Sequence, residues 1–173
     1  MIKNKNDLTI VAEKWLNNFL IKAYSSEYDV YTMICEQNIS KINHPDLKTY
    51  INYSAFNFQP DVLGILKNKR NKKVELVFLN RSFSPISLRE IGELFCYSKL
   101  VNPKLSILFS LKGAASEVNL MLLKKQISDT LLNFKGENPM YLIQIDSTKG
   151  RLNPDFLFPN DGDLVKKMLD INI

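Results

Sequence analysis

Hydrophobic positions recur at helical spacing near the start of the chain and then alternate with polar ones. From Asp7 to about Ala23, apolar residues fall three and four positions apart, which predicts an amphipathic helix capped by Asp7. Residues 28–35 predict a strand, and residues 36–48 are polar and typical of a loop. Residues 49–58 alternate and are rich in aromatic side chains, which predicts a second strand.

The middle of the chain predicts a hairpin followed by a helix. Residues 60–66 and 74–79 are apolar, and the basic tip KNKRNKK, residues 67–73, separates them. Ser87 and Glu90 form a capping box, which predicts a helix that ends near Val101, before Pro103.

Strands and helices alternate through the rest of the chain. The pattern predicts a strand at 105–111, a helix at 116–134, a strand at 140–145, a loop at 147–160 and a closing helix at 163–169. A hairpin followed by strands that alternate with helices predicts an α/β fold, in which helices flank both faces of a mixed sheet. No repeat or linker divides the chain, so residues 1–173 are expected to form a single domain.

Composition narrows the class of protein. A hydrophobic fraction of 45% is enough to build a core in 173 residues, and the net charge of +5 permits an anionic partner such as nucleic acid without requiring one. Polar residues interrupt the apolar positions that follow MIKNKNDL. We therefore expect neither a signal peptide nor a membrane span.

Cysteine and histidine usage argues against disulfides and zinc. Cys35 and Cys96 both lie in apolar runs, which predicts two buried, reduced thiols and a cytoplasmic protein. His44 is the only histidine, so a zinc enzyme is not expected. The sequence also lacks a P-loop, a GxSxG motif and an HExxH motif.

Two carboxylates occupy apolar strands. Glu75 is the one charged residue in VELVFL, and Asp61 precedes VLGIL. A tight hairpin would place them opposite each other or one diagonal step apart, where a cation such as Mg²⁺ would offset their repulsion. In the alternative interpretation, Glu75 lies at a sheet edge and pairs with a lysine, and Asp61 only starts a turn after Pro60.

The order of these motifs resembles the PD-(D/E)xK nucleases, which have the restriction-endonuclease-like fold. In that family a Pro-Asp opens one strand, the next strand carries an acidic residue, any residue and then lysine, and a helix and a buried strand follow. Pro60-Asp61 matches the first element and Glu75 the acidic position, while Glu93 and Tyr97 resemble the Gln-x-x-x-Tyr helix motif of the RecB-like branch. The resemblance covers about residues 58–112.

The lysine position of the motif is occupied by Val77. Valine can neither activate water nor stabilise charge on a phosphate. Lys73 and Arg81, which share strand parity with Glu75, and Lys99 on the following helix are the alternative cations. Glu13 on the first helix is a further candidate for the acidic cluster, although a solvated position on the helix surface is the favoured interpretation.

The resemblance implies a magnesium-dependent DNA endonuclease. Asp61 and Glu75 would hold the metal, and Glu93 and Tyr97 would complete the catalytic set. The cations expected to contact nucleic acid are Lys69, Arg70, Lys72, Lys73, Arg81 and Lys99. The alternative is a catalytically inactive domain of the same fold that binds nucleic acid or a partner protein, and the resemblance also allows a homodimer.

Overall fold

The computed structural model describes residues 2–50, 52–135 and 138–172. Five α-helices are seen in this part of the chain: α1 (Lys5–Tyr24), α2 (Leu88–Val101), α3 (Ser116–Leu122), α4 (Lys125–Leu132) and α5 (Asp163–Leu169). The strands are β1 (Tyr28–Ile34), β2 (Val62–Asn68), β3 (Val74–Ser82), β4 (Leu105–Ser110), β5 (Asn133–Lys135), β6 (Asn138–Asp146) and β7 (Arg151–Phe158). Three short 3₁₀ helices, Ile39–Lys41, Leu47–Thr49 and Tyr53–Ala55, connect β1 to β2.

The strands form one mixed sheet, in the order β1-β2-β3-β4-β6-β5, with β7 also paired to β6. β1, β2 and β3 are antiparallel neighbours, whereas β3, β4 and β6 run parallel to one another. Helix α2 makes the crossover from β3 to β4, as parallel pairing requires. The predicted α/β class and mixed sheet are confirmed.

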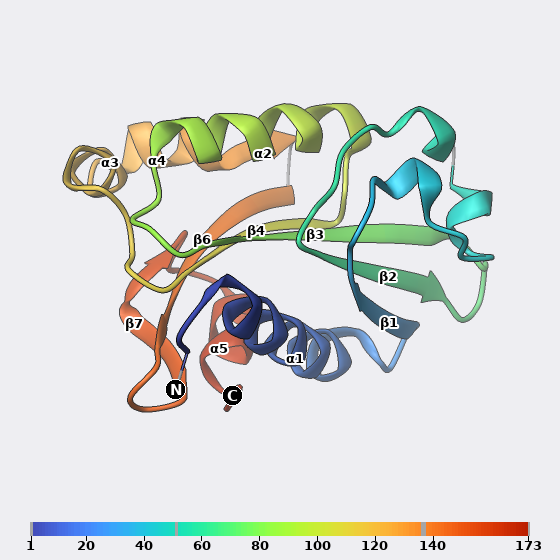
Figure 1. Ribbon diagram of the computed structural model, residues 1–173, viewed down its shortest axis with the longest axis horizontal. Helices are drawn as coiled ribbons and strands as arrows, with labels where there is room; N and C mark the ends of the chain where they lie inside the picture. Colours follow the sequence, from blue (N-terminus) through green and yellow to red (C-terminus); the bar gives the residue numbers. More distant parts are fainter. Residues whose placement is uncertain (1, 51, 136–137, 173) are drawn as a thin grey trace.

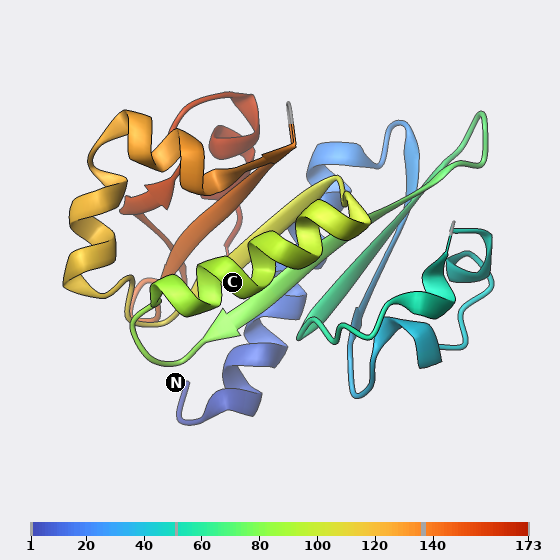
Figure 2. The same ribbon diagram turned by 90° about the horizontal axis from the view of Figure 1, so that it is seen from above.

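Helices cover both faces of the sheet (Figure 1). α1 and α5 pack on one face, where Trp15, Phe19 and Phe109 are fully buried. α2, α3 and α4 lie on the other face, over a second core that contains Phe78. Viewed from above, the turn between β2 and β3 extends beyond these helices (Figure 2). No helix in the described ranges is long and apolar enough to span a membrane.

Gly64 allows α1 to approach the sheet closely. A Cβ atom at this position would lie 2.8 Å from Cδ1 of Leu20 and 3.0 Å from Cβ of Val77. Both distances are shorter than a normal van der Waals contact, so a side chain here would push the helix away from the sheet. Val77, the cross-strand neighbour of Gly64, is therefore a core residue beneath α1.

The strand predicted at residues 49–58 is wrong. Thr49 ends one 3₁₀ helix and Tyr53–Ala55 form another, while Ile51 lies outside the described residues. Tyr50 packs its ring against Phe56 and donates a hydrogen bond to the carbonyl oxygen of Val101. Tertiary contacts of these aromatic rings, rather than strand pairing, explain the alternating pattern.

Two other predictions failed towards the C-terminus. The helix expected at 116–134 breaks at Leu123 and Lys124, and the break lets Val118, Leu122 and Leu132 all reach the same core. The loop expected at 147–160 contains β7. Pro154 is tolerated there because it falls where the β6–β7 pairing is interrupted.

The two cysteines differ from the prediction in one respect. Cys35 is buried, and burial raises the pKa of its thiol to about 12, whereas Cys96 is exposed on α2. Both are free thiols.

Candidate functional site

The register of the β2–β3 hairpin separates the two candidate carboxylates. Val62 pairs with Leu79, so Asp61 lies opposite Asn80, and the Asp61 N–H lies 3.4 Å from Oδ1 of that asparagine. Glu75 pairs instead with Leu66, near the turn. Asn80 and Glu75 are five positions apart along β3, which corresponds to about 16 Å. The expected register is therefore wrong, and Asp61 and Glu75 cannot share one cation.

Asp61 is held by Arg81. The Arg81 Nη1 atom lies 2.8 Å from Oδ1, and the Arg81 backbone N–H donates to Oδ2 at 2.8 Å. Nε of the same arginine donates to the carbonyl oxygen of Lys5. Burial raises the pKa of Asp61, because it outweighs the opposing hydrogen bond and charge of Arg81 and the charge of Lys5. The ion pair thus ties the start of β2 to the end of β3 and to α1.

The positions facing Asp61 do not carry the expected catalytic side chains. The residue across from it is Asn80, and the next residue of the same parity on β3 is Ser82, a buried side chain that donates to the carbonyl oxygen of Ser84. Val77, the motif's lysine position, is fully buried and lies earlier on β3, nearer the turn. Neither an acidic residue nor a lysine therefore follows the family pattern opposite Asp61.

The side chains around Asp61 do not fit a magnesium ion. Arg81 occupies both carboxylate oxygens, and a divalent cation would have to displace its guanidinium group. Mg²⁺ prefers several oxygen ligands, usually including more than one carboxylate or phosphate. Within the described ranges, no group of three His, Cys, Asp or Glu side chains is placed to hold a metal.

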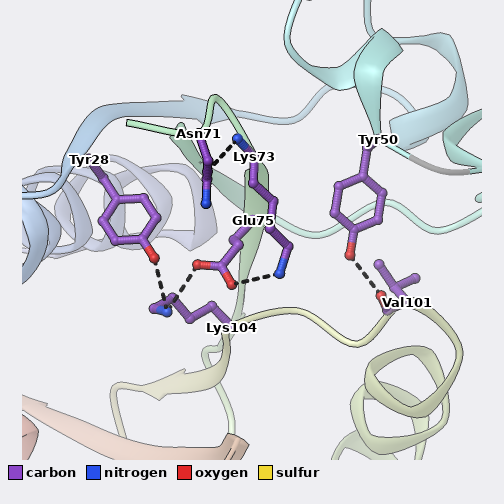
Figure 3. A network of polar contacts seen from close by, with 7 residues as sticks. All are labelled: Tyr28, Tyr50, Asn71, Lys73, Glu75, Val101 and Lys104. Carbon is purple, nitrogen blue, oxygen red and sulfur yellow. Dashed lines mark hydrogen bonds and ion pairs between the residues drawn. The ribbon is translucent and has the colours of Figure 1, made fainter. Parts of the chain in front are cut away.

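Glu75 lies in a separate network at the other end of the hairpin (Figure 3). Nζ of Lys104 lies 3.0 Å from Oε2 of Glu75, and Nζ of Lys73 lies 3.6 Å from Oε1. Lys104 also lies over the rings of Tyr24 and Tyr28, at 5.6 and 5.2 Å from their centroids. The lysine pairing of the alternative interpretation is confirmed, but its sheet-edge position for Glu75 is wrong, because β3 lies between β2 and β4.

Electrostatics in this network keep Glu75 ionised. Burial acts to raise its pKa, but hydrogen bonds from Lys104 and Tyr28 and the charges of Lys104 and Lys73 outweigh burial, and the pKa of Glu75 is lowered. Burial acts in the opposite sense on Lys104, whose pKa is nevertheless raised by Glu75 and Tyr28. Two protein cations thus neutralise this carboxylate.

Sequence reasoning missed Lys104, because no local pattern in the sequence links it to Glu75. Lys104 is far from Glu75 in sequence and reaches it because β3 and β4 pair in parallel, with Val77 beside Leu105. The Lys104 N–H donates to the carbonyl oxygen of Leu76 at 2.7 Å.

The remaining candidates on α1 and α2 are engaged elsewhere. Glu93 is exposed and pairs with Arg89 at 2.8 Å, one helical turn away. Tyr97 stacks on Phe58, with ring centroids 4.1 Å apart. Two further candidates make other contacts: Nζ of Lys99 lies 5.5 Å from the centroid of Phe95, and Glu13 accepts a hydrogen bond from Thr32. The structure does not bring these candidates together with Asp61 and Glu75 into one site.

The hairpin turn presents a group of exposed cations, which we call the basic turn: Lys69, Arg70, Lys72 and Lys73. Asn68 fixes its shape by accepting hydrogen bonds from the N–H groups of Arg70 and Asn71. Lys72 adopts a left-handed backbone conformation, with φ of 59°. The preceding Lys67 is not part of the group, because it pairs with Asp46 at 2.7 Å.

A cleft of about 530 Å³ opens beside the basic turn. Residues from the turn, from the end of α2 and from the segment before β2 line it, and they include Lys72, Lys73, Lys104 and Glu75. Sequence patterns did not indicate this cleft, because its walls come from segments that only the tertiary fold brings together.

No protein-family model matches the sequence, and no curated protein matches it.

Proposed function

We propose that this chain is a restriction-endonuclease-like domain that binds DNA through its basic turn and does not cleave it. One observation carries the proposal: both candidate carboxylates are neutralised by protein cations, whereas Arg70 and Lys72 form no ion pair with any residue in the described ranges. Cations without a protein partner can contact phosphates.

The order of the elements supports the fold part of this proposal. Helix α1 precedes an antiparallel run of three strands, and α2 then leads to a buried strand parallel to β3. Pro60 and Asp61 stand at the opening of β2, where the resemblance expects them. This fold does not depend on a bound metal at Asp61, because the Arg81 guanidinium group already neutralises that carboxylate in an ion pair.

The geometry argues against phosphodiester cleavage by the expected residues. Metal-assisted hydrolysis needs a cation held beside the reacting phosphate, together with a group that helps to generate the attacking hydroxide. The carboxylates lie about 16 Å apart, and Asn80 and Ser82 stand where an acid and a lysine would be needed. A binding function requires none of these groups.

Binding to labelled duplex DNA, followed by fluorescence anisotropy at several salt concentrations, tests the proposal. We expect the double variant Arg70→Gln/Lys72→Asn to bind more weakly than the wild type and to lower the salt slope by roughly 2, since each phosphate contact contributes about 0.9 for a duplex. Asparagine is chosen because it tolerates the left-handed backbone of Lys72.

The matched control removes the same two charges elsewhere. Lys124 and Lys125 are both exposed at the start of α4, so Lys124→Gln/Lys125→Gln should leave affinity and salt slope close to those of the wild type. If both double variants lose the same amount of DNA affinity, binding depends only on net charge. The proposal that the basic turn is the binding site would then be wrong.

A further inference from the structure

We infer that the cleft beside the basic turn receives one unpaired nucleotide of a single-stranded nucleic acid. The inference rests on the proposed nucleic-acid-binding function and adds the type of strand that the domain prefers. At about 530 Å³, the cleft is in the size range of ligand sites, which is about 300–1,000 Å³.

Charge in the cleft favours an anionic group. Lys72, Lys73 and Lys104 line it, and Glu75 is the one carboxylate among the described residues of its lining. Lys104 is the closer partner of Glu75, at 3.0 Å, whereas Lys73 lies at 3.6 Å with 70% of its side chain exposed. Lys73 can therefore turn to a phosphate without leaving Glu75 unpaired.

Apolar side chains in the same cleft suit the flat face of a nucleobase. Phe56, Val74, Leu100 and Val101 all contribute to its lining. Leu100 is 78% exposed, although it lies next to these other apolar groups. A base that covered Leu100 and the Phe56 ring would remove apolar surface from water.

Asn102 supplies a polar group that lacks a partner. Asn102 is one of the residues that line the cleft, and its Oδ1 atom is buried without a hydrogen bond to any described residue. A buried acceptor of this kind costs free energy until a donor reaches it. Rotation of the amide would turn the oxygen or the nitrogen towards the polar edge of a base.

The position of the cleft explains why the strand should be unpaired. Bases of a duplex are stacked and paired inside the double helix, so a base can enter a recess only from a single strand or after it is unstacked. Lys72 and Lys73 belong both to the basic turn and to the cleft lining. A backbone bound by the turn would therefore carry its bases past the opening.

Anisotropy with a labelled oligo(dT) strand, and with a duplex of the same length, tests the inference. The wild type should bind the single strand more tightly. Leu100→Ala should weaken single-strand binding by about fivefold, because it removes part of the apolar surface that a base would cover, and should leave duplex binding unchanged. The control is Leu120→Ala on α3, since Leu120 is also exposed, at 65%.

The outcomes separate this inference from the proposed function. If Leu100→Ala and Leu120→Ala bind oligo(dT) equally well, or if the wild type prefers the duplex, the cleft does not receive a base. In that case a loss of duplex binding by Arg70→Gln/Lys72→Asn would still support the basic turn. A wild-type protein that binds neither probe would overturn both.

Discussion

The carboxylate of Asp61 is engaged twice by Arg81, through the guanidinium group at 2.8 Å and through the backbone N–H at 2.8 Å. A residue that the sequence suggested as a metal ligand is thus part of an ion pair between strands. The pair closes the open end of the β2–β3 hairpin and also reaches Lys5 on α1.

Removing Arg81 should leave a partly buried carboxylate without its cation. At pH 7 we expect Arg81→Ala to lower the free energy of unfolding by about 2 kcal/mol, because charged hydrogen bonds contribute about 1.5–3 kcal/mol. Urea denaturation measures the change. The control is Arg89→Ala, which removes an arginine 2.8 Å from a carboxylate at an exposed position and should lower the free energy of unfolding much less, because water screens an exposed ion pair.

The pH dependence of the same variant gives a second readout. Burial raises the pKa of Asp61, so the folded protein takes up a proton at this group more readily than the unfolded chain does. Acid should therefore neutralise the unpaired Asp61 carboxylate. The loss in free energy of unfolding caused by Arg81→Ala should shrink as the pH falls through the pKa of Asp61. A deficit that grew with acidification would contradict this account of the ion pair.

Val77→Lys should unfold the protein rather than create a nuclease. Val77 is fully buried beneath α1, and its Cβ atom lies 3.0 Å from the position that a Cβ atom at Gly64 would occupy. A buried ammonium group without a partner costs several kcal/mol, and we expect a loss of about 3 kcal/mol or more by urea denaturation. Val77→Ala, which only removes volume, should be less destabilising. A stable Val77→Lys protein would show that the position is not a core site.

The ion pairs of Glu75 with Lys104 and Lys73 should stabilise the fold at neutral pH and lose this effect in acid. The folded pKa of Glu75 is lowered, so its contribution is fully present above the unfolded pKa and is lost as the pH falls through the folded value. We expect Glu75→Gln to lower the free energy of unfolding by about 1–2 kcal/mol at pH 7, given the partly exposed partners. The difference from the wild type should begin to shrink as the pH falls below the ordinary glutamate pKa of about 4.3, and it should disappear once the pH is below the folded pKa of Glu75. A constant difference would contradict the assignment.

Sequence patterns predicted the elements around the core better than the connections between them. The capping box of Ser87 and Glu90 was found, since it depends on residues three positions apart. The alternating aromatic residues around Tyr50 and Phe56 led to the wrong prediction of a strand, because a packed loop can bury alternating rings just as a strand does. β7 was hidden by Pro154, which a strand accepts only where pairing is interrupted.

The candidate site was only partly predictable, and for a physical reason. A hairpin that turns at Arg70 and Asn71 places Asp61 opposite Asn80, so the position of the turn determined the correct register. The prediction assumed instead that two carboxylates in apolar strands must lie together. Each found its own cation, Arg81 and Lys104, and the latter depends on a parallel pairing that no local pattern shows.

Incubation of the wild-type protein with end-labelled DNA and Mn²⁺ or Mg²⁺, resolved on native and denaturing gels, tests the central claim most directly. We predict a shifted band on the native gel and full-length DNA on the denaturing gel, with the shift lost in Arg70→Gln/Lys72→Asn. Metal-dependent shortening of the DNA that disappears in Asp61→Ala would contradict the account and identify the chain as an endonuclease.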